Sequence, residues 1–472
     1  MTHNLRRPFT AVILTIFLVA LEGRSLAQEQ SPSPVARPSA TPGTTATDVQ
    51  PATSISDTPT TASPQTHSQS PHSEPNTSGV TVASLVEAAL AANPEITAMR
   101  REFDAARARV PQAKALPDPM VTFGNNTQGN PIPFSGLRGD FSEIYVGASQ
   151  DLPWFGIRRL RGQVASAEAE ARFQEYAATV RRITAEVKTA YYDLYNTERA
   201  LVVIRRDGDI LDKMAQVAEA RYSVGKAQQV DAINARVEIT ELLHRQGELE
   251  IRRATALAQL NTLLYHDPET PIGTLATVRL SPEPPPLEEL VRLAAENAPE
   301  LAQQRRLIDA RSRAVRLAER EARSPEVGLS FTYHNRPAFP DYYTYGVTVR
   351  LPLYAATKQR YAIEEQAANL AAARSRLEAN DVMIRNRLRE ARTRATTTAR
   401  LIRLHDQGLL PQATLALESS LSTYQVGQVE FLTVLTAVRR ALDVELRYYE
   451  LVTEYQKALA EMERYTGVEL AR

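Results

Sequence analysis

Hydrophobic and polar positions follow the same order twice between residues 80 and 472. Each copy starts with a helical pattern, continues with two stretches that alternate apolar and polar residues, and ends with two long helical patterns joined by a turn. Three pairs of short sequences align the copies: Asn93-Pro94-Glu95-Ile96 with Ala298-Pro299-Glu300-Leu301, Leu152-Pro153-Trp154-Phe155 with Leu351-Pro352-Leu353-Tyr354, and Tyr222-Ser223-Val224-Gly225 with Tyr424-Gln425-Val426-Gly427. We therefore predict a duplicated unit, with a first repeat at 80–275 and a second at 276–472.

The alternating stretches predict two strands in each repeat. Alternation is clearest at 327–333 and 343–351, and it is weaker at 121–124 and 144–149. Strands of about 9–11 residues are long enough to cross a bilayer when tilted; the alternative is a half-buried hairpin of a soluble protein. Because four strands cannot close a barrel and open edges are not tolerated in hydrocarbon, membrane strands would require several chains to share one barrel. The pattern alone allows two copies or three.

The helical patterns are unusually long and rich in alanine. They cover 156–206, 209–222 and 227–264 in the first repeat, and 356–406, 411–424 and 428–465 in the second. A helix of about 50 residues extends for about 75 Å, which is longer than globular packing requires. Small side chains let such helices approach closely along extended seams. Gly208 and the pair Gly408 and Pro411 predict an interruption at equivalent places in both repeats.

The chain begins with features of an export signal. Arg6 and Arg7 precede an apolar run at 9–21, and small residues precede Gln28, so we predict a signal peptide at 1–27. The run is shorter than the ~20 residues that a membrane-spanning helix needs. Residues 28–79 are rich in Pro, Ser and Thr and contain few large apolar residues, which predicts a disordered arm. We therefore predict that the chain is exported.

Composition excludes several classes of function. The chain has no cysteine, so disulfides, thiolate metal sites and cysteine nucleophiles are absent. Its net charge is zero with both signs interspersed, which argues against nucleic acid as a partner. Glu241 and His244 form one Glu-x-x-His pair, whereas a di-iron bundle needs two pairs and two further carboxylates. We predict that the protein is not an enzyme and has no catalytic residues, no cofactor and no metal site.

The duplicated strand pairs, alanine-rich helices and Tyr-x-x-Gly turns together resemble the TolC family of bacterial outer-membrane efflux proteins across about 82–467. Leu152-Pro153-Trp154-Phe155-Gly156, followed by Arg158-Arg159-Leu160-Arg161, is similar to the heavy-metal branch typified by CusC and CzcC. The resemblance implies a homotrimer in which each chain gives four strands to a twelve-stranded membrane β-barrel, with an α-helical barrel reaching into the periplasm. It also implies a passive conduit that receives substrate from a resistance-nodulation-division inner-membrane pump through a periplasmic adaptor (membrane fusion) protein.

The resemblance implies a periplasmic entrance at the two turns, where the adaptor docks and the tunnel closes. Tyr222, Gly225, Tyr424 and Gly427 match the family's turn motif, and Asp231 matches an acidic position that would form a ring of three carboxylates in a trimer. The alternative for Asp231 is that it only caps or solvates the start of a helix. A salt-bridged gate is not expected, since the corresponding positions of the second turn carry no charge: Val429, Thr433 and Thr436.

Aromatic residues after the strands are candidates for the membrane interface. Trp154, Phe155 and Tyr354 follow Pro153 and Pro352, where an aromatic belt in contact with outer-membrane lipid would lie. The sequence thus favours an outer-membrane efflux conduit, with heavy-metal cations as cargo. The alternatives are a duct of the same family for organic drugs or type I secretion, and an exported structural coiled coil without a pore, which does not account for the alternating strands.

Overall fold

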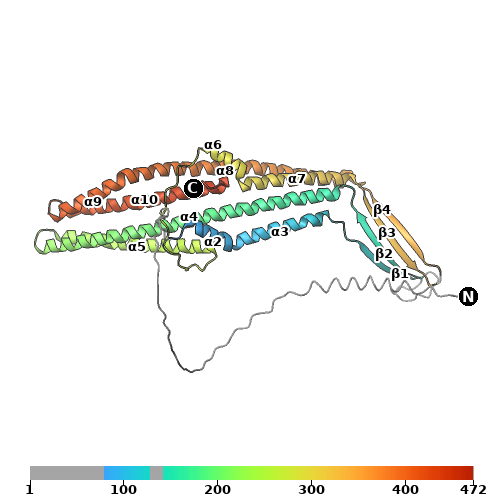
Figure 1. The fold of residues 1–472 in the computed structure, drawn as a ribbon, viewed down its shortest axis with the longest axis horizontal. Coiled ribbons are helices and arrows are strands. Elements are labelled where there is room, and N and C mark those ends of the chain that lie inside the picture. Colours follow the sequence, from blue (N-terminus) through green and yellow to red (C-terminus); the bar gives the residue numbers. More distant parts are fainter. Residues whose placement is uncertain (1–78, 128–141, 338, 471–472) are drawn as a thin grey trace, which may run out of the picture. The chain divides into compact units, whose positions relative to one another are not determined.

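The computed structural model describes residues 79–127, 142–337 and 339–470. The predicted signal peptide at 1–27 and the predicted arm up to residue 78 lie outside the described residues and stay predictions. The described part contains four strands and a series of mostly long helices (Figure 1). In chain order these are α2 (Val82–Ala92), α3 (Pro94–Lys114), β1 (Met120–Asn126), β2 (Glu143–Leu152), α4 (Ile157–Ser223), α5 (Gln229–Leu264), α6 (Leu287–Asn297), α7 (Pro299–Arg323), β3 (Glu326–Asn335), β4 (Tyr342–Arg350), η1 (Ala355–Gln359), α8 (Arg360–Leu404), η2 (His405–Leu409), α9 (Leu410–Gln425) and α10 (Phe431–Thr466).

The first two helices of each repeat meet at a proline. Pro94 and Pro299 occupy the first turns of α3 and α7, where a missing N–H has no intrahelical partner to lose. Asn93 caps α3 by accepting the Glu95 N–H at 2.9 Å, and its amide donates to the Leu263 carbonyl at 3.1 Å. One residue therefore ends α2 through its backbone N–H, and its side chain starts α3 and holds it against the end of α5.

The four strands form one antiparallel sheet in the order β1-β2-β3-β4, which confirms the predicted strands. Each pairs with the next in the chain, although α4, α5, α6 and α7 separate β2 from β3. β1 has 7 residues, fewer than expected. Pro119 directly precedes it and has no N–H to donate to the ladder, so pairing begins only at Met120.

The predicted interruption at Gly208 is wrong. Helix α4 runs through Gly208 without a break for 67 residues, which corresponds to about 100 Å at ~1.5 Å per residue. In the second repeat, the π-helical turn η2 (His405–Leu409) contains Gly408 and separates α8 from α9. Proline accounts for the difference, since Pro411 has no N–H and its ring displaces the preceding carbonyls, whereas a lone glycine costs only about 1 kcal/mol relative to alanine.

The long helices pack as a layer whose two sides come from different repeats. Helix α4 packs against α3, α5, α7 and α10, and α8 packs against α7 and α10. Helix α9 continues from η2 beside α10, so the hairpins α4–α5 and α9–α10 end next to each other (Figure 1). None of the helices in the described ranges has an apolar stretch long enough to span a membrane.

Candidate functional site

The two hairpin ends use the same backbone turn. After α4, Gly225 adopts φ +69° and donates its N–H to the Tyr222 carbonyl at 2.9 Å. After α9, Gly427 adopts φ +83° and donates to the Tyr424 carbonyl at 2.9 Å. Glycine suits both positions because it has no Cβ to oppose a positive φ.

The two predicted tyrosines lie in different environments despite their equivalent positions. Tyr222 is 47% exposed, whereas Tyr424 is 4% exposed. The Tyr424 ring packs edge-on against Phe431, with 5.8 Å between ring centroids, inside an apolar cluster shared by α4, α5, α9 and α10. Only the second tyrosine therefore belongs to the packing that joins the two hairpins.

Arg221 links the hairpins directly, and the sequence analysis did not identify it. This residue in the last turn of α4 donates a hydrogen bond from Nη1 to the Tyr424 carbonyl at 2.6 Å. Its guanidinium carbon lies 4.9 Å from the centroid of the Tyr424 ring, within cation–π range. A Cβ at Gly427 would lie 2.9 Å from Arg221 Nη2, so any other residue there would displace the end of the arginine side chain.

Asp231 lies in the first turn of α5 and acts electrostatically on Tyr424. Burial raises the pKa of Tyr424, the Arg221 charge lowers it, and the Asp231 charge raises it. The Tyr424 hydroxyl is buried without a hydrogen-bond partner. The structure thus brings Asp231, Arg221 and Tyr424 to one place, where a cation, a carboxylate and an unsatisfied hydroxyl influence one another.

The uncharged residues of the second turn contribute packing and helix structure. Val429 is partly buried against the apolar cluster of the hairpin ends. The hydroxyl of Thr436 donates to the Leu432 carbonyl of its own helix at 2.8 Å, and Thr433 is exposed. These three positions supply no charge opposite Asp231.

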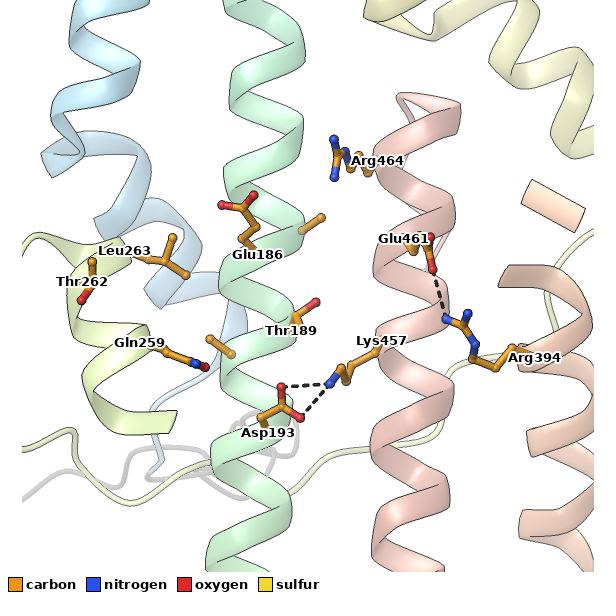
Figure 2. A pocket seen from close by; sticks show the side chains of 12 residues that line it. Glu186, Thr189, Asp193, Gln259, Thr262, Leu263, Arg394, Lys457, Glu461 and Arg464 are labelled. Atoms are coloured by element: carbon orange, nitrogen blue, oxygen red, sulfur yellow. Dashed lines mark hydrogen bonds and ion pairs between the residues drawn. The ribbon is translucent and has the colours of Figure 1, made fainter. Parts of the chain in front are cut away.

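A charged cavity of about 570 Å³ lies between α4, α5, α8 and α10 (Figure 2). Lys457 Nζ contacts both carboxylate oxygens of Asp193 at 2.8 and 2.9 Å, and Arg394 contacts Glu461 at 3.1 Å. Arg464 also lines the cavity, and its Nε is buried without a hydrogen-bond partner. The wall therefore carries both signs of charge, most of them already paired.

This cavity is on the face of the helix layer opposite the short helices α2 and α6. Successive helical residues are about 100° apart around the axis, so Asp193 of α4 points away from Val187 and Tyr191, which pack in the α2 cluster. Likewise Lys457 of α10 points away from Tyr455, which packs in the α6 cluster. The short helices thus cover one face of the layer, and the charged wall belongs to the other.

The sheet has one apolar and one polar face, set by the strand register. Val121, Ala148, Phe331 and Tyr345 lie in one cross-strand row, and the large side chains of this face are exposed. The next row, on the opposite face, contains Thr122, Gly147, Thr332 and Thr344. An exposed apolar sheet face is expected only where lipid or another protein covers it.

The predicted interface aromatics follow β2 and β4 directly. Phe155 and Tyr354 are exposed, and Trp154 is half-buried with its ring 5.7 Å from that of Phe155.

The Glu-x-x-His pair of α5 lies on the surface. His244 is exposed beside Glu248 at 3.4 Å, and Glu241 lies 3.5 Å from Arg439. Within the described ranges, no group of three or more His, Asp or Glu residues could hold a metal ion.

Comparison with known proteins identifies the family. The sequence model of the outer membrane efflux proteins matches residues 85–264 and 290–468. The chain belongs to the outer membrane efflux protein family. It is 25% identical over 407 residues to the cobalt-zinc-cadmium resistance protein CzcC of Cupriavidus metallidurans, an alignment that covers 82% of this chain and 90% of CzcC.

Solved structures of outer-membrane channels have the same fold. The crystal structure of CusC superposes with a TM-score of 0.71 at 16% identity, over 82% of this chain and 92% of CusC. VceC from Vibrio cholerae gives a TM-score of 0.68 at 17% identity, over 82% of this chain and 96% of VceC. These matches confirm the predicted fold class and the family resemblance. Members of the efflux protein family are outer-membrane channels, not enzymes. As a member of this family, the chain is an outer-membrane protein whose helices extend into the periplasm.

Proposed function

We propose that this efflux protein is the outer-membrane conduit of a tripartite system that exports heavy-metal cations, acting as a homotrimer that conducts passively. In this proposal a periplasmic adaptor and a resistance-nodulation-division pump in the inner membrane deliver the cargo. The observation that carries the metal assignment is the similarity to the cobalt-zinc-cadmium resistance protein CzcC, which extends over 90% of that protein.

The arrangement of free edges supports assembly into a closed ring. β1 and β4 are the two edges of the sheet, and α3 and α5 of the first repeat lie on the opposite side of the helix layer from α8 and α9 of the second. Contact between the first-repeat side of one copy and the second-repeat side of the next is a head-to-tail interface, which makes a ring when the rotation closes. Three copies would give twelve strands and leave no open edge in the membrane.

Exposed apolar side chains on these sides support the same assembly. Val230, Ile233 and Val237 line one face of α5, and Val382 and Met383 are exposed on α8. In a ring of copies, each of these faces would be covered by a neighbour. A structural coiled coil without a pore would bury such helix faces, but it would leave the apolar face of the sheet in water.

The charged cavity suits the inner wall of the conduit. If α2 and α6 lie outside the ring, where they do not obstruct it, then Asp193, Lys457, Arg394 and Glu461 face the interior. Paired charges hold water and ions weakly, and conduction requires binding that is weak enough for cargo to leave. Tight metal capture is not needed on this wall.

The hairpin ends would form the periplasmic entrance and the docking place of the adaptor. Tyr222 and Gly225 of one hairpin and Tyr424 and Gly427 of the other form equivalent turns, with Asp231 close to Tyr424. Three copies of Asp231 would present a ring of carboxylates to an entering cation. Trp154, Phe155 and Tyr354 would lie at the membrane interface.

The direct test is conductance. Purified protein reconstituted in planar bilayers is expected to give discrete channel events, and native mass spectrometry of the same sample is expected to give a trimer. Deleting the protein in its host should increase the accumulation of Zn²⁺, Co²⁺ or Cd²⁺ without changing tolerance to organic dyes. A trimer that does not conduct would refute the conduit, and a loss of dye tolerance alone would refute the metal cargo.

A further inference from the structure

A cluster of polar side chains at one end of the sheet joins all four strands. Its centre is Glu143 of β2, which is 8% exposed. Glu143 accepts hydrogen bonds from the Asn126 amide of β1 at 2.6 Å and from the Tyr342 hydroxyl of β4 at 3.0 Å. His334 of β3 places Nδ1 3.3 Å from Glu143 Oε1. The register puts all four residues on the polar face.

His334 is held in one orientation by its neighbours. Its ring stacks on Tyr342 with 4.2 Å between centroids and 8° between planes. Nε2 lies 3.3 Å from the Thr344 hydroxyl, and Nδ1 is buried against the carboxylate of Glu143. Without a metal, a proton on Nδ1 would face the carboxylate of Glu143; a divalent cation would replace that proton, and the imidazole would then carry its proton on Nε2, which can donate to Thr344. A histidine whose second nitrogen is fixed in this way is typical of metal ligands.

The distance between the two ligand atoms fits a bound cation. Two ligands on a tetrahedral Zn²⁺, each with a bond of about 2.0–2.1 Å, lie about 3.3 Å apart. His334 Nδ1 and Glu143 Oε1 are separated by 3.3 Å. An imidazole nitrogen with a carboxylate oxygen suits zinc and neighbouring divalent metals.

We propose that His334 and Glu143 form a binding site for a divalent metal cation such as Zn²⁺, one per chain, on the polar face of the sheet. The proposal rests on the proposed function, in which this face lines the channel through the membrane. Within the described ranges the two residues have no third His, Asp or Glu ligand beside them, so water would have to complete the coordination. Such a site binds weakly and suits a cation in transit.

The test measures Zn²⁺ binding to the purified trimer by calorimetry and block of single-channel current by Zn²⁺. Wild type is expected to bind one Zn²⁺ per chain at this site and to lose current when Zn²⁺ is added. His334→Gln and Glu143→Gln should each weaken binding at least about tenfold and relieve the block. His244→Gln is the matched control, because His244 lies 3.4 Å from Glu248 on an exposed helix, and it should leave the block unchanged.

Several results would overturn the site. Unchanged Zn²⁺ affinity in both sheet variants, or loss of block only in His244→Gln, would place Zn²⁺ elsewhere. A conducting wild-type trimer that ignores Zn²⁺ would show that His334 and Glu143 are only an ion pair, and it would leave the conduit intact. If the Glu143→Gln trimer does not assemble, the Zn²⁺ affinity and current block of the His334→Gln variant alone decide whether the site exists. Failure of wild type to conduct at all would instead refute the proposed function.

Discussion

Arg221 connects the two hairpin ends of the chain through one side chain. Its hydrogen bond to the Tyr424 carbonyl and its contact with the Tyr424 ring span the two repeats at the hairpin ends. Farther from the turns, Arg439 of α10 also pairs with Glu238 of α5 beside the apolar packing. A hydrogen bond from a charged donor contributes about 1.5–3 kcal/mol. Arg221 is therefore the polar contact that fixes the two turns relative to each other, beyond the ion pairs along the helices.

Replacing Arg221 with alanine should loosen the hairpin ends. We expect a broader distance distribution between spin labels at positions 223 and 425, and a higher single-channel conductance, because the link between the repeats is lost. Arg236→Ala is the control, since Arg236 pairs with Glu219 within the first hairpin only. Identical distributions in the Arg221 variant and wild type would exclude a role for this link in closure.

The buried hydroxyl of Tyr424 makes the hairpin ends sensitive to high pH. Burial raises the pKa of Tyr424 above its ordinary value of 10.0. Below pH 10, Tyr424 is protonated in both the folded and the unfolded state, so its contribution to stability does not change with pH. Above pH 10, Tyr424 ionises first in the unfolded state, and the free energy of unfolding falls. Tyr424→Phe should remove this loss and cost little at neutral pH, because the hydroxyl has no partner.

The measurement is a series of thermal melts between pH 8 and 11. The stability difference between wild type and Tyr424→Phe should stay constant up to about pH 10, the ordinary tyrosine pKa, and then move in favour of the variant. Other buried tyrosines titrate in both proteins and cancel in this comparison. A difference that does not change with pH would mean that Tyr424 is accessible to water.

At the residue scale, the sequence located the turn residues but did not predict how deeply each of them is buried. The Tyr-x-x-Gly motif occurs at both turns, but it does not distinguish the exposed Tyr222 from the buried Tyr424. Tyr424 is covered by Phe431 and by Arg221 of the other hairpin, and the residue before it, Thr423, differs from Arg221 at the equivalent position. The long side chain of Arg221 reaches across to the other hairpin, whereas that of Thr423 is too short, and a motif shared by both repeats does not contain that information.

At the scale of elements, the two faces of the sheet give a direct test of orientation. Val347 lies on the apolar face opposite Leu329, and Thr348 lies on the polar face opposite Gly328. Val347→Arg should reduce the amount of trimer in the outer membrane, since arginine facing lipid costs about 2–4 kcal/mol at the midplane. Thr348→Arg should assemble normally, and equal yields of both variants would contradict the assignment of the faces.

The strands were predictable because alternation is a local signal. Their order was not, since β2 and β3 pair across four intervening helices and nothing local marks the partner. Helix lengths followed from periodicity, whereas the interruption was expected in both repeats and occurs only at η2. A single glycine weakens the helical pattern in the sequence, but it does not interrupt a helix that packs against neighbours on both sides.

At the scale of the whole molecule, each copy should meet the next along β1 and β4. The chain has no native cysteine, so introduced thiols report only the intended contacts. With Thr122→Cys in β1 and single cysteines placed in turn along 342–350, oxidation should link chains in a ladder that ends at three. The control pair Gly147→Cys and Thr332→Cys lies directly across β2 and β3 and should link within one chain. A longer ladder would refute a closed trimer.

The exposed apolar face of the sheet also affects how the channel is made. A single chain released into the periplasm would present this face and two unpaired strand edges, a surface that favours aggregation. In the proposed trimer both are covered only when three copies meet. Channel formation then depends on three chains meeting. The yield of trimer should therefore rise more steeply than the concentration of free chains until assembly saturates. The rate at which three chains meet would therefore limit how fast new efflux capacity appears.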